Sequence, residues 1–322
     1  MDSEFHYYVT GLIAQRAGFS DRDAKIIACS SEYVDENDLC FKIEDAQTGD
    51  IYENFISQTM NILLPKQELM RIYPIFHFVP GDPTAKSARR KDGKMHILNT
   101  TPDNDRAKAL LADAFGATGS LLPYRIGIAS HAYVDTWAHQ NFVGWYSDFN
   151  QIGSNIIPNI GHADAIHHPD WIGHQWVDPR LVKSEVNNQV RFLEAAEALL
   201  RQYCTHLNKT DADARWRALE TDLEGVFNPT FTGPAIKYKE ERLKALTTLT
   251  GFAEFDEWRW YKEAIKKHWP PVDDSDGYWR DDIDKADTDW WRFQESVKAH
   301  EKTGIQVLSD LFEEMDVKID QA

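Results

Sequence analysis

The chain has 322 residues, of which 42% are hydrophobic and 27% are charged, and its formal net charge is −17. This length and composition are typical of a globular protein with a substantial core, either as one large domain or as a domain with an appended one. The negative charge argues against broad electrostatic attachment to nucleic acid or to an anionic membrane surface, although a local cationic site such as a metal cluster could still take a phosphate.

The N-terminal sequence MDSEFHYYVTGLIAQRAGF lacks the basic segment, the long apolar run and the small-residue cleavage site of a secretion signal. No stretch of about eighteen uninterrupted apolar residues predicts a transmembrane segment. The cysteines, Cys29, Cys40 and Cys204, are odd in number and scattered, so a disulfide framework is not expected. We therefore expect a cytoplasmic protein, or one exported by a route that uses no N-terminal signal peptide.

The first two predicted helices each carry one candidate metal ligand. Apolar residues recur with a helical period over residues 5–13, and Gly18 is well placed to end this helix, which has His6 near its start. A lone histidine there is usually a surface or capping residue. Ser20 begins the second helix, and Asp35 lies at the end of its inner face. This carboxylate is either a helix-terminal turn residue or a ligand.

The next segment is less regular. Residues 41–58 alternate around the sequence TGD and predict a short β-hairpin or an irregular excursion. Residues 69–79 lead into the sequence FHFVPGDP, whose prolines and glycine stop any regular element. His77 therefore lies at the end of an element or in a loop, a good position for a ligand that must reach across to a helix. Residues 82–102 are polar and predict an exposed loop with solvated basic side chains.

A helix predicted over residues 103–116 precedes the central helix, which starts at Pro123. This central segment spaces His131, Asp135 and His139 by four and four residues, which puts them within an arc of about 80° on one helix face. Imidazole and carboxylate are ligands that suit zinc or a similar divalent ion. The spacing therefore predicts a metal site.

The simpler interpretation of this face is an ordinary surface pair between His131 and Asp135. However, Tyr124 and Ile128 continue the same face toward the N-terminus, so the pair lies on the stripe that should point inward. A buried carboxylate needs a cation or a full set of hydrogen-bond donors. The metal interpretation is therefore favoured.

A second dense run of candidate ligands is IGHADAIHHPDWIGHQW, residues 160–176, which holds four of the twelve histidines of the chain. An expression tag would be contiguous and terminal, and this cluster is neither, so metal binding is the favoured explanation. The candidates in this run are His162, Asp164, His167, His168, Asp170 and His174.

The second half of the chain predicts long helices with charged outer faces, the first of them beginning at Asp178-Pro179. They are expected near residues 180–207, 211–226, 234–249, 253–268 and 287–315. This half is rich in tryptophan, with Trp216, Trp258, Trp260, Trp269, Trp279, Trp290 and Trp291. We find no ligand constellation there. We expect residues 1–208 to form a metal-binding helical catalytic domain, and residues 209–322 to form a helical C-terminal region that packs on it or extends it.

The order of these motifs resembles that of the zinc-dependent phospholipase C and single-strand-specific zinc nuclease superfamily. The matching sequences are EFHYYVT, SSEYVDEN, FHFVPGD and SHAYVDTWAHQNF, and the resemblance covers about residues 4–170. The chain also looks like an uncharacterised group of bacterial proteins that begin with a similar FHYYVT helix. The resemblance implies a mainly α, multi-helix zinc phospholipase C-like fold with an additional C-terminal helical region. It implies metal ligands at His6, Asp35, His77, His131, Asp135, His139 and His162.

Two features depart from this family. Its members use the amine and carbonyl of a mature N-terminal tryptophan as a zinc ligand, whereas this chain starts MDSEFH, so that Asp2 or Glu4 would have to substitute. The family also completes its third zinc site with an acidic residue four positions after a histidine, but Ile166 stands four residues after His162. That site is either absent or completed by Asp164, His167, His168 or Asp170.

The resemblance implies a metal-dependent hydrolase of a phosphoester bond, with two or three zinc ions or another divalent metal. Asp135 would bridge two ions, and Asp35 would orient or deprotonate the attacking water. The remaining ligands would be His131 with His77 for one ion, His6 for its neighbour, and His139 with His162 for a third.

The substrate is expected to be a small phosphoester or a lipid headgroup. The negative charge disfavours long nucleic acid, and the lack of a visible signal weakens an extracellular lipase role. Tryptophans near the expected site could stack a nucleobase or line a headgroup pocket, namely Trp137, Trp145, Trp171 and Trp176. The alternative is a non-catalytic, metal-stabilised helical protein with a binding or structural role, whose site would be closed and four-coordinate. A metallohydrolase of the His-Asp type would carry an adjacent His-Asp dipeptide, which the sequence lacks.

Overall fold

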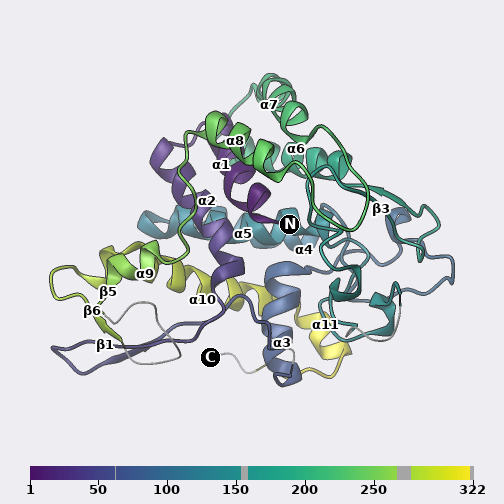
Figure 1. Ribbon diagram of the computed structural model, residues 1–322. Helices are drawn as coiled ribbons and strands as arrows, with labels where there is room; N and C mark the ends of the chain where they lie inside the picture. Colours follow the sequence, from purple (N-terminus) through teal and green to yellow (C-terminus); the bar gives the residue numbers. More distant parts are fainter. Residues whose placement is uncertain (62, 154–158, 267–276, 320–322) are drawn as a thin grey trace.

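The computed structural model describes residues 1–61, 63–153, 159–266 and 277–319 (Figure 1). Most of the regular structure is helical, which confirms the prediction of a mainly α fold. The α-helices of the described residues are α1 (Thr10–Ala17), α2 (Asp21–Glu36), α3 (Lys66–Ile72), α4 (Asp105–Phe115), α5 (Leu122–Ala138), α6 (Asn188–His206), α7 (Ala212–Phe227), α8 (Lys239–Thr250), α9 (Arg259–Ala264), α10 (Asp289–Val307) and α11 (Ser309–Glu314).

Short helical segments and strands complete the described chain. Two segments are π-helical, η1 (Glu4–Val9) and η2 (Tyr73–His77). The 3₁₀ segments are η3 (Lys86–Ala88), η4 (Gly119–Leu121), η5 (Asp148–Asn150), η6 (Ala163–Ala165) and η7 (Lys285–Asp287). The strands are β1 (Lys42–Glu44), β2 (Ile51–Glu53), β3 (Gln175–Val177), β4 (Glu185–Asn187), β5 (Ile265–Lys266) and β6 (Gly277–Trp279).

The β-hairpin expected within residues 41–58 is present. Strands β1 and β2 pair antiparallel, with Ile43 opposite Tyr52, and Gly49 takes a positive φ of 75° in the turn between them. The four-stranded sheet has the order β2-β1-β6-β5, in which β1 and β6 are parallel. This sheet lies at the edge of the helical body, next to α9 (Figure 1).

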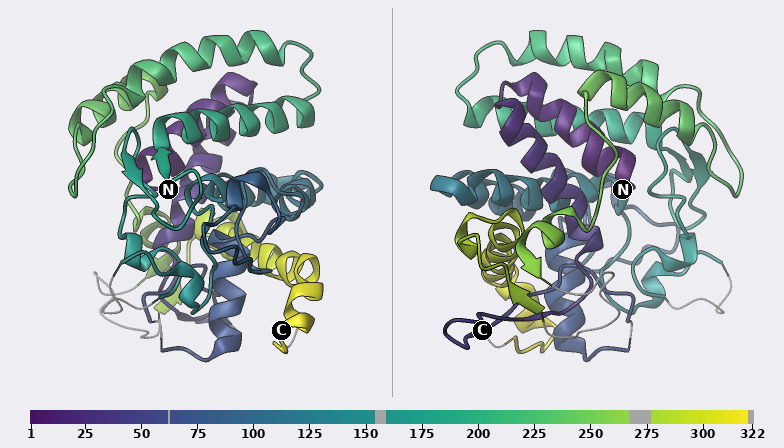
Figure 2. Two further views of the ribbon diagram at one scale, coloured as in Figure 1. Left: turned by 90° about the vertical axis from the view of Figure 1, so that its right-hand side faces the viewer. Right: turned by 60° about the vertical axis from the view of Figure 1, so that its left-hand side comes forward.

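Helix α5 is the centre of the fold. Every residue from Ile126 to Ala138 is buried, as expected of a helix enclosed by other elements. Helices α6, α7 and α8 lie on one side of α5, and α3, α10 and α11 lie on the other (Figure 2). Helices α2, α4, α6 and α10 all pack directly on α5. The two aspartates expected at the metal site, Asp35 and Asp135, therefore come from two helices in direct contact.

Gly127 sets the distance between α2 and α5. A Cβ atom added at this position would lie 2.5 Å from the carbonyl oxygen of Ile27 and 2.5 Å from the Cβ of Ser30, both on α2. These contacts are shorter than van der Waals separation, and one of them is to the backbone. Only glycine therefore allows α2 to approach α5 this closely.

We expect Gly127→Ala to destabilise the fold by about 1–3 kcal/mol, because the added methyl group must push two packed helices apart. Denaturant unfolding at equilibrium measures this change. Gly225→Ala is the matched control on α7, since nothing lies within 4 Å of the Cβ it would add, and it should leave the stability unchanged or raise it. Equal stability of Gly127→Ala and the wild type would show that α2 and α5 can separate without cost.

The helix predicted near 180–207 begins later than expected. The carboxylate of Asp178 does not cap a helix but pairs with the guanidinium of Arg180 at 2.6 Å. Residues 185–187 form β4, which pairs antiparallel with β3. Asn187 then caps α6. A tight turn stabilised by an ion pair thus replaces the first two turns of the predicted helix.

Two further helix predictions are wrong in extent. In the described part of segment 253–268 the helix is the short α9, because residues 253–256 are irregular and the chain becomes extended at Ile265, where β5 begins. Residues 267–269, which include Trp269, lie outside the described residues. The helix predicted over 287–315 is divided at Leu308 into α10 and α11. The helices predicted near 211–226 and 234–249 correspond to α7 and α8.

Segment 82–102 is only partly the exposed loop that was expected. Arg90 is buried, and its guanidinium donates a hydrogen bond to the carbonyl oxygen of Phe149 at 2.7 Å while it covers the ring of that residue. Thr100 is also buried and bridges to Pro80. The guanidinium of Arg90 therefore holds this loop against the rest of the fold. This side chain is buried, whereas the sequence predicted solvated basic side chains in the segment.

The C-terminal half packs on the half that carries the expected ligands. Trp260, Trp279 and Trp290 belong to the same hydrophobic cluster as Tyr33 of α2 and Tyr124 of α5. Helix α8 contacts η1, and α10 contacts both α4 and α5. The division into domains at residue 208 stays a prediction. In the described part of the chain, none of the helices combines the length and the apolar character needed to cross a bilayer.

Candidate metal centre

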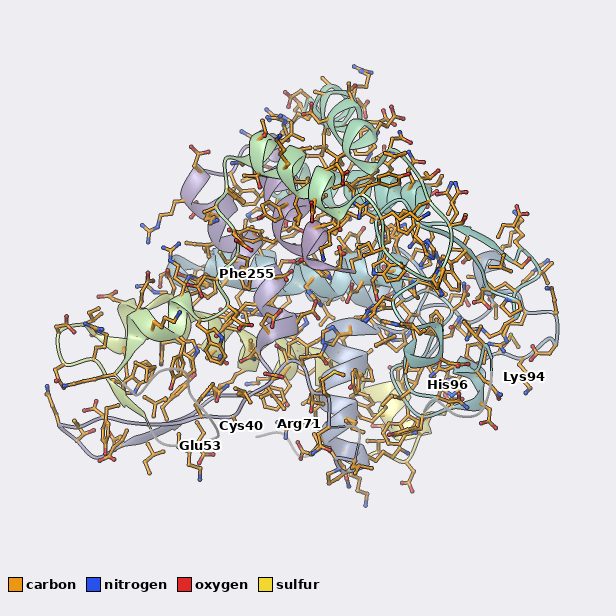
Figure 3. The ribbon with its side chains drawn as sticks, viewed as in Figure 1. Cys40, Glu53, Arg71, Lys94, His96 and Phe255 are labelled. Atoms are coloured by element: carbon orange, nitrogen blue, oxygen red, sulfur yellow. The ribbon has the colours of Figure 1, made fainter. Side chains whose placement is uncertain are left out.

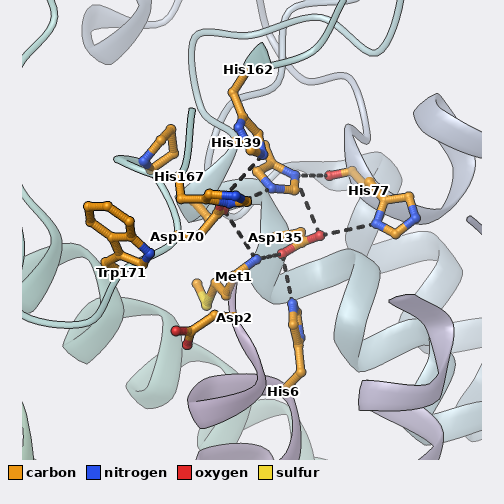
Figure 4. Close-up of polar contacts among 12 residues, drawn as sticks. Met1, Asp2, His6, His77, Asp135, His139, His162, His167, Asp170 and Trp171 are labelled. Carbon is orange, nitrogen blue, oxygen red and sulfur yellow. Dashed lines mark hydrogen bonds and ion pairs between the residues drawn. The ribbon is translucent and has the colours of Figure 1, made fainter. Parts of the chain in front are cut away.

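The predicted ligands meet where η1, α2, η2, α5 and the segment 160–170 converge (Figure 4). Three sets of potential ligand atoms each lie within 4.8 Å of one another. These sets are His6–Asp35–His131, His77–His131–Asp135 and His139–His162–Asp170. All seven ligand positions suggested by the sequence are therefore close together in the fold, and Asp170 joins them.

Asp135 lies at the middle of the cluster and is only 1% exposed (Figure 4). Its Oδ1 atom lies 3.1 Å from Nε2 of His6, and its Oδ2 atom lies 3.2 Å from Nε2 of His131 and 3.6 Å from Nδ1 of His77. Burial raises the pKa of this carboxyl, but the neighbouring His139, followed by the α-amino group of Met1 and His131, outweighs burial and holds the pKa well below its usual range. Asp135 is thus an ionised carboxylate in a buried site.

The histidines are oriented by backbone carbonyl groups. A carbonyl oxygen only accepts, so the ring nitrogen that contacts it must carry the proton, and a neutral ring then keeps a lone pair on its other nitrogen. Four rings make such a contact: His131 Nδ1 to Ser31 (2.7 Å), His77 Nε2 to Ser57 (2.9 Å), His139 Nδ1 to His77 (2.7 Å) and His162 Nδ1 to Ile166 (2.7 Å). In each ring the nitrogen left over faces a carboxylate of the cluster.

The contact between His131 and His77 needs either a proton on one of the two facing nitrogens or a metal ion between them. Nε2 of His131 lies 3.1 Å from Nδ1 of His77, and each ring already donates its other nitrogen to a carbonyl. Two neutral rings would therefore direct two lone pairs at each other. Two nitrogens bound to one tetrahedral zinc ion at about 2.0–2.1 Å would lie about 3.3 Å apart, close to the separation seen here.

Other buried atoms of the cluster also lack hydrogen bonds. They include Oδ2 of Asp135, Oδ1 of Asp170 and both ring nitrogens of His6. Unsatisfied buried polar atoms are costly unless another group satisfies them. Carboxylates and imidazoles that converge with the α-amino group of Met1 as the only other donor to Asp135 among the described residues fit a divalent metal such as zinc. The residues present therefore fit the implied metal.

His6 comes from the first π-helical segment, η1, and is fully buried. Its ring stacks on that of His131, with the ring centroids 3.8 Å apart. Burial, followed by the neighbouring His131, lowers the pKa of His6 to about 3. The second π-helical segment, η2, ends at His77. Both segments therefore place a candidate ligand, which agrees with the frequent use of π-helical turns at functional sites.

Asp170 is the member of the 160–176 run that joins the third set. Its Oδ1 lies 3.4 Å from Nε2 of His139, and its Oδ2 lies 3.4 Å from Nε2 of His162. Asp164 instead accepts the backbone N–H groups of Ile152 and Gly153. The two other candidates lie outside the set: the side chain of His167 is 68% exposed, and His168 contacts His174 at 2.8 Å.

The N-terminal segment enters the cluster differently from what the sequence suggested. The α-nitrogen of Met1 is buried and donates to Oδ1 of Asp135 at 2.6 Å, a contact that sequence reasoning missed. Burial lowers the pKa of this amine, but the carboxylates of Asp135, Asp170 and Asp35 outweigh burial and raise it to about 11. Asp2, one of the two expected substitutes, lines the cavity above the cluster.

Glu4, the other expected substitute, is directed away from the cluster. Its carboxylate pairs with Arg242 of α8 through Nε at 2.6 Å and Nη2 at 3.1 Å. Both side chains are buried, at 0% and 2% exposed. Because its two oxygens are held by this bidentate pair, Glu4 is not placed to bind a metal. The pair instead anchors η1, and with it His6, to the C-terminal half.

The chain matches the model of a family of unknown function, DUF6765, over residues 1–308. It belongs to this family. Comparisons with curated proteins and with solved structures found no significant match. Membership of DUF6765 assigns no activity, so the function must be argued from the site itself.

In this DUF6765 member, a cavity of about 500 Å³ opens above the cluster, onto Asp35, His139 and Asp170. Away from the candidate ligands, the cavity is lined mainly by apolar side chains. These are Tyr73, Phe78, Ile160, Ile166 and Met60. None of its lining residues within the described chain is a lysine or an arginine. The tryptophans expected near the site, at positions 137, 145, 171 and 176, do not line this cavity. Phenylalanine, tyrosine and aliphatic side chains form its wall instead.

Proposed function

We propose that this protein is a metal-dependent hydrolase that cleaves a phosphoester bond, with zinc as the expected metal. The observation that carries the proposal is the orientation of the histidines. Four rings, of which His77, His131 and His139 are buried, each donate one N–H to a backbone carbonyl and turn the other nitrogen toward a carboxylate. The order of the ligands along the chain, which resembles that of the zinc phospholipase C and nuclease superfamily, supports the same proposal.

The three ligand sets would hold two or three ions. Asp135 belongs to the second set, and its Oδ1 also faces His6 of the first set. A bound divalent ion supplies Lewis-acid stabilisation of the phosphoryl oxygens and lowers the pKa of water. The chain itself supplies the orientation of the ligands, through the carbonyl contacts that fix each ring.

Asp35 is the residue best placed to accept a proton. Its side chain is 29% exposed and lines the cavity, whereas those of Asp135 and Asp170 are 1% and 9% exposed. Burial raises the pKa of Asp35, but His131, followed by His6 and His77, outweighs burial and lowers it. Asp35 is therefore ionised at neutral pH and accessible from the cavity, as a general base must be.

The cavity favours a substrate with little negative charge beyond its phosphoester. Among the described residues no lysine or arginine lines it, and the whole chain carries a formal charge of −17, so its walls offer a long polyanion little attraction beyond the histidine cluster and the α-amino group of Met1. The aromatic and aliphatic wall suits an apolar alcohol portion. A small phosphoester or a lipid headgroup fits these properties better than a nucleic acid strand.

We expect the purified protein to contain two or three divalent ions per chain, because three ligand sets are present. Elemental analysis after metal supplementation measures this number. His131→Gln should lower it, since His131 belongs to two of the sets. His96→Gln is the matched control, because His96 belongs to none of the three sets, does not line the cavity and accepts the N–H of Leu98 instead, so it should leave the metal content unchanged. Less than one ion per chain in the supplemented wild type would reject the proposal.

The reaction itself is tested with a panel of phosphodiesters and phosphomonoesters, including phosphatidylcholine, single-stranded DNA and RNA, and small nucleotides. Turnover should stop on chelation and return with zinc. A fully metallated protein that hydrolyses nothing on the panel, and whose ions are four-coordinate without water, would instead support the non-catalytic, metal-stabilised alternative.

A further inference from the structure

A second and larger cavity, of about 870 Å³, lies between α2, α8 and residues 254–258; we call it the α2–α8 cavity. It is separate from the candidate metal centre, but the two meet at the N-terminal segment, because Asp2 lines the first cavity and Ser3 lines the second. In Figures 1 and 2 the chain that leaves α8 runs down beside α2 toward α9, and Phe255 in this stretch is labelled in Figure 3.

The walls of the α2–α8 cavity are acidic. They carry two lysines, Lys239 and Lys244, against a larger set of carboxyl groups, Glu32, Glu36, Glu240, Glu254, Asp256 and Glu257. These groups come from three separate elements, α2, α8 and residues 254–258. Lys239 is drawn toward Asp2, with its Nζ 3.7 Å from Oδ2. The lysines thus leave an excess of carboxyl groups around the cavity.

Glu32 differs from an ordinary surface carboxylate of an acidic cluster because it is buried. It is only 4% exposed, lines the cavity from α2, and has an oxygen, Oε2, that makes no hydrogen bond. Among the described residues, Glu32 forms no ion pair with any lysine, arginine or histidine. A buried carboxyl without a partner is costly to the fold, so a ligand that supplies a cation would stabilise it.

A second pair of carboxyl groups faces the same space. Glu36, one turn beyond Glu32 on α2, and Glu257 both line it. The α2–α8 cavity therefore has two acidic positions, one at Glu32 and one at the Glu36–Glu257 pair.

The remaining wall is aromatic and apolar, formed by Tyr8, Phe255, Trp258 and Leu243. Aromatic faces attract ammonium groups, and apolar side chains accept the carbon chain between them. A bare metal ion fits less well, because no carboxyl group of this cavity belongs to a set of three ligands within 4.8 Å of one another. Two acidic positions joined by an aromatic wall fit several ammonium groups linked by aliphatic carbons.

We propose that the α2–α8 cavity binds an aliphatic polyamine, with one ammonium group at Glu32, a second at the Glu36–Glu257 pair, and the carbon chain against Phe255 and Trp258. This site is independent of the metal chemistry proposed above. A polyamine bound there would also contact the N-terminal segment, because Ser3 forms part of the cavity wall.

The test is calorimetric titration of the full-length, zinc-supplemented protein with spermidine. We expect saturable binding of one spermidine per chain that weakens as salt is added. Glu32→Gln should weaken it about tenfold or more, because it removes one charge-assisted hydrogen bond. Glu314→Gln, at an exposed acidic residue of α11, is the matched control and should bind like the wild type.

Glu257→Gln provides a second, partly exposed variant and should also weaken binding if Glu32→Gln fails to fold. Magnesium chloride at the same concentration of positive charge tests for diffuse attraction to an acidic surface and should compete poorly. The proposal is overturned if spermidine does not bind, if both variants bind as tightly as the wild type, or if magnesium displaces spermidine as well as spermidine displaces itself.

Discussion

Replacing Asp135 by alanine is expected to remove at least two metal ions together and to lower the stability of the whole fold. Asp135 belongs to the His77–His131–Asp135 set, and its Oδ1 also lies 3.1 Å from Nε2 of His6 in the first set, so a bridging Asp135 would hold two ions and its loss would release both. The helix that carries it is the one on which α2, α4, α6 and α10 pack. Structural zinc ions contribute about 10–16 kcal/mol of apparent binding free energy in small peptides, so losing two should cost several kcal/mol of stability.

Elemental analysis and thermal unfolding measure the two effects of Asp135→Ala. Asp164→Ala is the matched control, because that carboxylate holds two backbone N–H groups near the third ligand set without belonging to it. Chelation should lower the stability of the wild type toward that of Asp135→Ala, while the variant itself should respond little. If Asp135→Ala loses a single ion, the bridging role is wrong and each ion has its own carboxylate.

The local part of the site could be predicted from the sequence. His131 and Asp135 lie one helical turn apart, and their common face follows from periodicity alone. The position of Asp35 at the end of the inner face of α2 can likewise be predicted from the residues of that helix alone. The β-hairpin also follows from a short alternating segment with a glycine in its turn. In each case the deciding residues lie within about twenty positions of one another.

The parts that failed depend on residues far apart in the chain. Glu4 looked available as a ligand, but its partner Arg242 is 238 positions away and gives no local signal. Asp170 could not be chosen over its neighbours, because the choice depends on where His139 lies after α5 has packed. The helix predicted over 253–268 gave way to the shorter α9, because Ile265 and Lys266 form β5 and pair with β6, whose residues come later in the chain.

At two candidate ligands the backbone differs from the α-helical geometry that sequence periodicity assumes. His6 and His77 both lie in π-helical segments, whose wider turns change the direction in which the side chains point. An α-helical projection would place each ring at a different angle. The ligand order along the chain still identified both residues, because order does not depend on the exact pitch.

Asp35→Asn is expected to lower the rate of phosphoester hydrolysis by a factor of about 10²–10⁴ while the metal content stays nearly intact. The amide has nearly the same shape as the carboxylate and keeps one oxygen, so the packing at the end of α2 and a potential ligand atom remain. What it loses is the negative charge that accepts a proton from water. The side chain is also the most accessible of the three carboxylates, so the change does not disturb a fully buried position.

Single-turnover rates at saturating substrate, with elemental analysis of the same samples, separate the two possible roles of Asp35. Asp38→Asn, at an exposed residue three positions further along, is the matched control and should leave both quantities unchanged. A fall in rate with full metal content means that Asp35 acts on the water. A fall in rate that only parallels the loss of an ion would reduce Asp35 to a ligand of the His6 and His131 set, and an unchanged rate would remove it from the reaction. Because His131 and His77 hold the pKa of Asp35 below its usual value, the rate of the wild type should not fall through titration of this group until the solution is acidic.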